Sequence, residues 1–162
     1  MSDLTPKRAA DSQSEMVQFV VPNDANPLGF ILGGTVMHLI DIAGAIACHR
    51  HTRSRLVTAA VDNLQFLHPI KVGDLIILKS RVTCTFTTSL EVQVDVFSEE
   101  TLTGKRLLTS RAFLTFVAVS QEGARVRVPP LLVETDDDRR TCEEAHARRA
   151  ERLKRKSLNP LP

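Results

Sequence analysis

One carboxylate in this chain stands where a carboxylate is hard to explain. Asp41 is the single acidic residue in the apolar segment from Gly33 to Ala47, which is otherwise built of glycine, alanine, branched aliphatic residues, methionine, threonine and histidine. An ionised carboxylate that leaves water loses several kcal/mol unless it is solvated or paired. Asp41 is therefore either paired for structural reasons or placed where chemistry happens.

Two glycines, Gly33 and Gly34, stand about two helical turns before Asp41. The first N–H groups of a helix have no partner within the helix and lie at the positive end of its dipole, so they can bind a carbonyl oxygen as it gains charge. A carboxylate deeper in the same helix could then act on a water molecule or on the carbonyl carbon. This combination is suited to acyl transfer.

Other candidate residues are less convincing. His38 could form a dyad with Asp41 three residues later, or it could be a packed or partly exposed histidine. Cys48 lies near the C-terminal end of the expected helix, where nothing lowers the pKa of a thiol. His49 and His51 alternate at that end and do not share a face with His38, so we expect no metal among the functional groups.

The helix that must carry Asp41 is expected from about Thr35 to His49. Its apolar residues fall on every side, so no single stripe can be drawn, and other structure should wrap it. Gly44 and the neighbouring alanines keep part of its surface thin enough for a sheet to come close.

Several segments have the β-branched, alternating composition of strands. They cover residues 16–21, 56–67, 75–86, 89–97 and 107–119. The second is interrupted near Asp62 and Asn63, which indicates a bulge, and the fourth alternates apolar with polar residues, which indicates one wet face. We therefore predict an α+β domain in which a curved antiparallel sheet of about five strands encloses the helix. Long sheet edges favour an oligomer.

The domain is expected to span residues 16–133, after a flexible arm over 1–15 and before a charged tail over 134–162. Within the tail, residues 139–156 can form a helix, with acidic residues before its start and basic residues at its end, as the helix dipole favours. Such a charge run is either a solvated face or an arm that reaches an anionic ligand or a neighbouring subunit.

The composition excludes several classes of function. A net charge of +2 and the absence of Trp and Tyr give no reason to expect nucleic-acid binding, and no run approaches the roughly 20 apolar residues of a membrane span. Cys48, Cys84 and Cys142 are odd in number for a complete disulfide set and too far apart for a zinc ribbon. We therefore expect a reducing, cytoplasmic compartment.

In several segments the chain resembles the hotdog-fold acyl-CoA thioesterases, specifically the YciA and cytosolic acyl-CoA hydrolase group. The segments are PNDANPLGFILGGTVMHLIDIAGAIA, TAAVDNLQF, HPIKVGD, TTSLEVQV, AFLTFVAV and VPPLL, which together cover about residues 16–133. The resemblance implies a hotdog fold and hydrolysis of acyl-CoA to fatty acid and CoA, a step of lipid metabolism. It implies no cofactor, because coenzyme A belongs to the substrate and the product.

The resemblance also implies roles for particular residues. Asn26 matches the asparagine of the family's loop and Asp41 its helix aspartate, and in relatives these two face each other across a subunit interface. Gly33 or Gly34 would lend the amide that polarises the thioester carbonyl. A homodimer with two equivalent sites is therefore expected, with a further trimer of dimers by analogy. Asp41 would deprotonate a water that Asn26 positions, or would attack the carbonyl itself to form an anhydride.

The resemblance further implies contacts with coenzyme A. The matching residues are Thr58, Ala59, Ala60, Val61, Thr88, Ser89 and Leu90, with Arg148 and Arg149 in the basic tail. Two other functions stay open: a non-catalytic hotdog module that binds and senses acyl-CoA, and a dehydratase on the same fold, for which His38 would be the candidate histidine.

Overall fold

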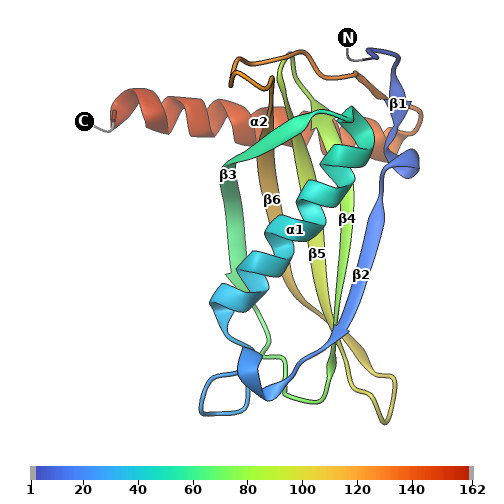
Figure 1. Cartoon of the computed structure of the whole chain (residues 1–162), viewed down its shortest axis with the longest axis vertical. Helices are drawn as coiled ribbons and strands as arrows, with labels where there is room; N and C mark the ends of the chain where they lie inside the picture. Colours follow the sequence, from blue (N-terminus) through green and yellow to red (C-terminus); the bar gives the residue numbers. More distant parts are fainter. Residues whose placement is uncertain (1–2, 161–162) are drawn as a thin grey trace.

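A long central helix lies against one face of a five-stranded antiparallel sheet (Figure 1). The computed structural model describes residues 3–160. The helix is α1 (Gly33–Thr52), and the strand order is β2-β4-β5-β6-β3. The bounds of these strands are β2 Ser14–Phe19, β3 Arg55–Phe66, β4 Leu75–Thr85, β5 Ser89–Glu99 and β6 Arg106–Val119. The predicted α+β architecture is confirmed. No helix within residues 3–160 combines the length and the apolar character that crossing a bilayer requires.

The core lies between α1 and the inner face of the sheet. Leu90, Val92, Val94 and Val96 alternate along β5, and all four are fully buried. At Gly44 the helix backbone comes so close that an added Cβ would lie 3.1 Å from Val92 Cγ1 and within 3.3 Å of the Phe116 ring. The expected close approach of sheet and helix is therefore confirmed, and Gly44 is the residue that permits it.

The strand β3, which forms one edge of the sheet, contains two irregularities. Its register with β6 shifts between Asp62 and Gln65, as predicted, and Asn63 there has a left-handed backbone with φ 56°. A second shift lies between Thr58 and Ala60, which leaves Ala59 without a partner on β6. This second bulge directly follows Thr58 and was not predicted.

The N-terminal segment is more ordered than expected. β1 (Lys7–Arg8) pairs in parallel with β7 (Leu131–Leu132), and the short 3-10 helix η1 (Ala9–Asp11) leads into β2. A second such helix, η2 (Pro22–Asp24), follows β2. The prediction of a flexible arm is wrong from Lys7 onward, because the partner strand is more than a hundred residues away in the sequence and leaves no local signal.

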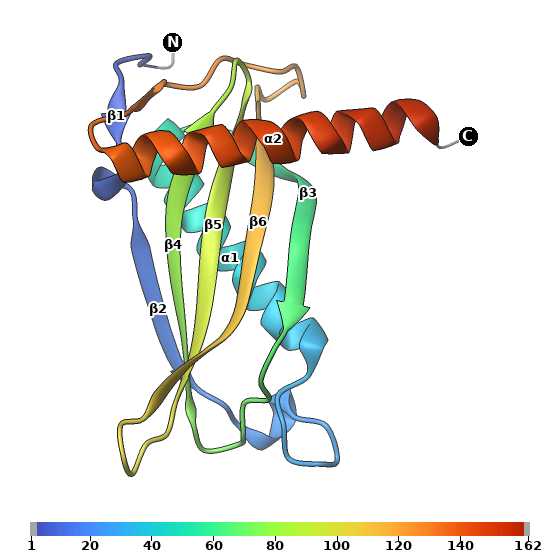
Figure 2. The same ribbon diagram turned by 180° about the vertical axis from the view of Figure 1, so that it is seen from behind.

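A second helix, α2 (Asp136–Leu158), lies across the outer face of the sheet (Figure 2). It begins before the expected residue 139, because Thr135 and Asp138 form a capping box. Ala145 of this helix is fully buried, and the Arg148 side chain pairs with Glu91 of β5. The tail helix therefore has one buried side, and the wet face predicted for β5 is covered at Glu91.

The cysteines also differ from expectation. Cys84 of β4 and Cys142 of α2 form a disulfide, while Cys48 is free and buried. Their wide spacing in the sequence concealed this contact, since it depends on α2 folding back over β4.

His51, near the C-terminal end of α1, contacts two segments that are distant in the sequence, one around Lys7 and one around Pro129. Its side chain is fully buried, and Nε2 lies 3.0 Å from the carbonyl oxygen of Pro129. Since a carbonyl can only accept, Nε2 carries the proton in the neutral ring. Its Nδ1 is buried without a partner among the described residues, and Lys7 donates to the backbone oxygen of His51. Burial lowers the pKa of His51, and the Lys7 charge acts in the same direction.

We expect the free energy of unfolding to fall as the pH drops below 6.5, the ordinary pKa of His51. The unfolded chain takes up a proton there that the folded chain resists, so stability is full above this pH and is lost as the pH falls toward the lowered pKa of the folded state. Urea denaturation between about pH 8 and pH 5 should show a smaller decrease for His51→Gln than for the native chain. The exposed His49→Gln is the matched control. Equal decreases in all three proteins would contradict this assignment.

Candidate active site

Asp41 lies on the partly exposed side of α1, opposite β3. The Thr58 hydroxyl donates a hydrogen bond of 2.7 Å to Asp41 Oδ1. Among the described residues no group donates to Oδ2, so one carboxylate oxygen is held and the other is available. A cavity of about 290 Å³ adjoins the pair and is otherwise lined mainly by apolar side chains. These are Met37, Ile40, Val61, Leu64 and Leu114, together with His38.

Asn26 lies in the loop that precedes α1, and its amide has a defined orientation. Its Oδ1 accepts hydrogen bonds from the backbone N–H groups of Leu28 and Phe30, at 3.0 and 3.2 Å. Only the amide oxygen can accept these two bonds, so the oxygen faces the loop backbone and Nδ2 occupies the other position of the amide. Within residues 3–160 no acceptor lies within hydrogen-bond distance of Nδ2, so two donors remain available.

The start of α1 also leaves donors available. Its N-cap residue, Leu32, cannot cap with its side chain, and the first helical bond runs from Val36 N–H to the Leu32 oxygen at 3.1 Å. The N–H groups of Gly33 and Gly34 therefore have no acceptor in the described part of the chain. A Cβ at Gly33 would make ordinary contacts of 3.5 Å with Phe66, and a Cβ at Gly34 would meet nothing within 4 Å. Neither packing nor backbone angles within the chain require these glycines, which leaves the helix start open to a group from outside.

These donors and the carboxylate lie apart in one chain. Asn26 and Gly33 line a cavity of about 370 Å³ that also includes Phe66, and Asp41 does not line it. Gly33 and Asp41 are separated by eight residues of α1, or about 12 Å along the helix axis. One water molecule cannot touch groups at both places. The chain therefore presents two half-sites, one with the donors and one with the carboxylate.

The residues expected to contact coenzyme A fall into two places on the sheet. Thr58, Ala59 and Val61 are exposed on β3, with Ala60 partly exposed between them. Thr88 and Ser89 are partly exposed at the turn between β4 and β5. Leu90 is fully buried and pairs with Phe116 across the sheet, so its side chain belongs to the core and offers no surface to a ligand.

The two arginines of the tail differ in their surroundings. Arg148 donates to both oxygens of Glu91, at 3.0 and 2.8 Å, and its guanidinium stacks 3.6 Å from the centre of the Phe113 ring. Arg149 lies over Phe86 at 4.8 Å and forms no ion pair within residues 3–160. Arg148 therefore fastens α2 to the sheet, while Arg149 keeps its charge available.

Two alternatives from the sequence lose support. His38 is exposed beside Asp41, but the hydrogen bond to Asp41 comes from Thr58 instead. Cys48 is fully buried, and burial raises the pKa of its thiol, which opposes a nucleophilic role. The link between Thr58 and Asp41 was missed, since nothing in the sequence indicates which β3 side chain reaches across to α1.

Comparison with known proteins identifies relatives that are named acyl-CoA thioester hydrolases. The sequence profile of the thioesterase superfamily matches residues 28–105. An uncharacterised acyl-CoA thioester hydrolase, YkhA, from Bacillus subtilis is 38% identical over 154 residues, which cover 94% of this chain and 90% of that protein. The human cytosolic acyl coenzyme A thioester hydrolase is 36% identical over 145 residues, or 88% of this chain. The chain spans only 38% of the length of that human protein.

Solved structures agree over nearly the whole chain. An apo-hexameric acyl-CoA thioesterase superposes with a TM-score of 0.90 at 39% identity, over 96% of this chain and 99% of that one. An acyl-CoA hydrolase from Staphylococcus aureus, solved with butyryl coenzyme A, coenzyme A and coenzyme A disulfide, gives a TM-score of 0.83 at 32% identity, over 94% and 95%. With these relatives and the helix-on-sheet fold described above, the chain belongs to the hotdog-fold acyl-CoA thioesterases of the thioesterase superfamily.

Proposed function

We propose that this protein hydrolyses the thioester of acyl-CoA, giving a free fatty acid and coenzyme A, at sites shared between two copies of the chain. One observation carries the proposal: a carboxylate with one free oxygen and a set of free N–H donors lie in separate half-sites of the same chain. Each half lacks what the other supplies. A two-fold pair of copies would complete two equivalent sites.

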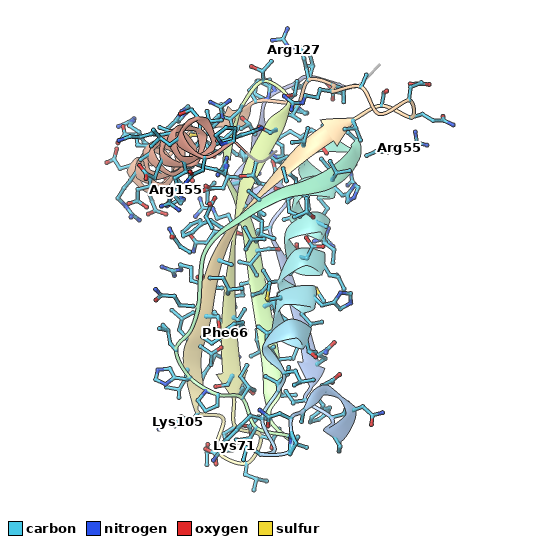
Figure 3. All side chains as sticks on the ribbon, turned by 90° about the vertical axis from the view of Figure 1, so that its left-hand side faces the viewer. Arg55, Phe66, Lys71, Lys105, Arg127 and Arg155 are labelled. Carbon is cyan, nitrogen blue, oxygen red and sulfur yellow. A yellow bond between two sulfur atoms is a disulfide. The ribbon has the colours of Figure 1, made fainter. Side chains whose placement is uncertain are left out.

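The surface around Asp41 supports such a pair. β3 is an edge strand, with β6 on one side and no strand on the other among residues 3–160. Along α1 and β3, large apolar side chains are about half exposed, namely Met37 at 48%, Val57 at 50% and, in the half-site of Asn26, Phe66 at 51% (Figure 3). A second copy that covers α1 and β3 would bury these side chains and pair the free backbone N–H and C=O groups of the edge strand. Because similar acyl-CoA thioesterases are hexameric, we extend the proposal to a trimer of dimers.

The chemistry follows from the groups available. The Asn26 amide of one copy holds a water molecule, and Asp41 of the other removes its proton as the oxygen attacks the thioester carbonyl. The free amides of Gly33 and Gly34 stabilise the negative charge that develops on the carbonyl oxygen. The carbon–sulfur bond then breaks and the thiolate of coenzyme A leaves. Thiolate is a good leaving group, so the step requires no strong acid, and the proposal requires no cofactor besides the coenzyme A of the substrate.

Coenzyme A itself would lie along β3 at Thr58–Val61 and reach the turn at Thr88 and Ser89. Of the two tail arginines, Arg149 is the one with a charge free to meet a phosphate. A cytoplasmic location is proposed from the relatives named cytosolic.

Replacing Asp41 by Asn should lower kcat by about 10²- to 10⁴-fold, because general-base assistance is lost. Binding of acyl-CoA should persist, since the amide preserves the shape of the side chain. A thiol-release assay on thioesters from acetyl to palmitoyl, with calorimetry for binding, measures both.

Asp136→Asn is the control for that substitution, because its carboxylate is fully exposed at the start of α2. Near-native turnover by Asp41→Asn would remove Asp41 from the mechanism. If the native protein binds the thioesters but hydrolyses none of them, the chain is an acyl-CoA sensor.

Replacing Thr58 by Val should lower kcat by about 10-fold or more, since a hydrogen bond to a charged group contributes about 1.5–3 kcal/mol. The loss should appear in kcat rather than in KM, because the hydroxyl holds the Asp41 carboxylate in its orientation. Thr101→Val, an exposed threonine remote from Asp41, is the control. A near-native kcat for Thr58→Val would show that Thr58 has no such role.

Mixing inactive Asn26→Ala chains with inactive Asp41→Ala chains should restore activity. In a mixed dimer one of the two sites contains both native residues, whereas the other site lacks both. Subunit exchange is verified by mass spectrometry before the assay. Exchange without recovery would mean that both residues act within one chain.

A further inference from the structure

A cluster of potential metal ligands lies where α2 crosses the sheet. Cys84 of β4, Cys142 of α2 and His146 of α2 each place one ligand atom within 4.8 Å of the others. Cys84 is buried, Cys142 is partly buried and His146 is exposed. Cys142 and His146 are four residues apart on a helix and therefore share a face. These residues lie outside both half-sites, and the proposed hydrolysis uses none of them.

We propose that, when the two cysteines are reduced, Cys84, Cys142 and His146 bind one soft divalent cation of the Zn²⁺ type and so fasten α2 to the sheet. Two thiolates and one imidazole are ligands that Zn²⁺ prefers. At bond lengths of about 2.3 Å for sulfur and 2.0 Å for nitrogen, ligand atoms around a tetrahedral ion lie about 3.5–4 Å apart. All three ligand atoms lie within 4.8 Å of one another. Once the sulfur–sulfur bond is broken, side-chain rotation can bring the two sulfurs and the imidazole to that separation, and a water molecule can fill the fourth position on the exposed side.

The neighbouring side chains suit an imidazole ligand. The His146 ring meets Phe86 edge to face, with ring centres 5.0 Å apart and an interplanar angle of 80°. This contact restricts the rotation of the imidazole. The Arg149 guanidinium also contacts the Phe86 ring, so a positive charge lies near the proposed site. This charge does not repel the loaded site, because two thiolates cancel the charge of the divalent ion.

The disulfide and the metal site are alternative states of the same residues. A dithiol reductant supplies two electrons and two protons, the Cys84–Cys142 sulfur–sulfur bond breaks, and the reductant leaves as its own disulfide. The cation then binds the two sulfurs and displaces their protons. In a reducing compartment the metal would thus replace the covalent tether between β4 and α2.

This tether has a defined place along α2. Asp138, one turn before Cys142, pairs with Arg81 of β4, and Arg148, further along, pairs with Glu91 of β5. The cluster lies between these two ion pairs in sequence. A bound cation would therefore hold the part of α2 that leads to Arg149.

The test uses the whole 162-residue chain, reduced with a phosphine and stripped of metal with a chelator, under anaerobic conditions. Titration with Co²⁺ alone should produce thiolate-to-cobalt charge-transfer absorption and the visible bands of a tetrahedral ion, saturating at one equivalent per chain. Zn²⁺ should bleach these bands and raise the thermal unfolding midpoint of the reduced protein. The oxidised protein, in which the two sulfurs are joined, should show neither effect.

Variants assign the ligands. Cys142→Ser should lose most of the charge-transfer absorption, and His146→Ala should weaken Co²⁺ binding by about 100-fold or more, beyond the 10- to 100-fold typical of outer-shell changes. His146 is exposed, so its variant is expected to fold, and circular dichroism verifies this for both. His49→Ala and Cys48→Ala are the matched controls and should bind as the native protein does. A reduced native protein without these bands, or bands that survive in Cys142→Ser and His146→Ala, would overturn the proposal. Neither the absorption measurement nor the thermal unfolding measurement depends on thioesterase activity, so this proposal can fail independently of the proposed function.

Discussion

The close approach of α1 to the sheet at Gly44 determines how the helix packs against the inner face of the sheet. A methyl group at that position would press on Val92 and Phe116, two side chains of the inner face, at 3.1 and 3.3 Å. With no side chain there, the helix sinks into the curved sheet and buries Leu39, Ile40, Ala43 and Ala47. Each large aliphatic side chain buried in this way contributes about 1.5–3 kcal/mol. The position and rotation of the helix are thereby fixed.

That rotation determines where Asp41 lies. With the Gly44 side of α1 against the sheet, Asp41 faces the gap between α1 and β3, where Thr58 reaches its carboxylate. The same rotation leaves Met37 exposed beside an unpaired strand edge. The position of the Asp41 carboxylate and the exposure of the apolar edge thus have one cause, and the proposed dimeric site depends on both. In the proposed dimer a second copy would cover this apolar surface and exclude water from around Asp41.

The sequence predicted what local periodicity and composition can encode. The alternation of Leu90, Val92, Val94 and Val96 identified β5, and the interruption at Asp62 identified a bulge. It could not predict contacts that depend on distant segments. The parallel pairing of β1 with β7 and the disulfide between Cys84 and Cys142 join residues that are neighbours only after α2 and the C-terminal loop have folded back. For the candidate site, the sequence identified the polar groups, but not the orientation of the Asn26 amide or the bond from Thr58, because backbone geometry sets both.

Glu91 shows why the charged tail was hard to interpret. In the strand pattern it occupies a polar position next to Gln93 and Asp95, and a solvated face was the natural expectation. The side chain is instead 2% exposed, and Arg148 and Thr83 satisfy both of its oxygens. Burying a carboxylate without a partner costs several kcal/mol, so the strand requires a cation from elsewhere in the chain. The helix supplies that cation at Arg148 and stacks the same guanidinium on Phe113, so its apolar and ionic contacts act together. The carboxylate on the outer face of β5 and the arginine-rich helix therefore belong to one packing arrangement. The burial of Glu91 can be explained only by the position of α2, and the position of α2 only by its contacts with the sheet.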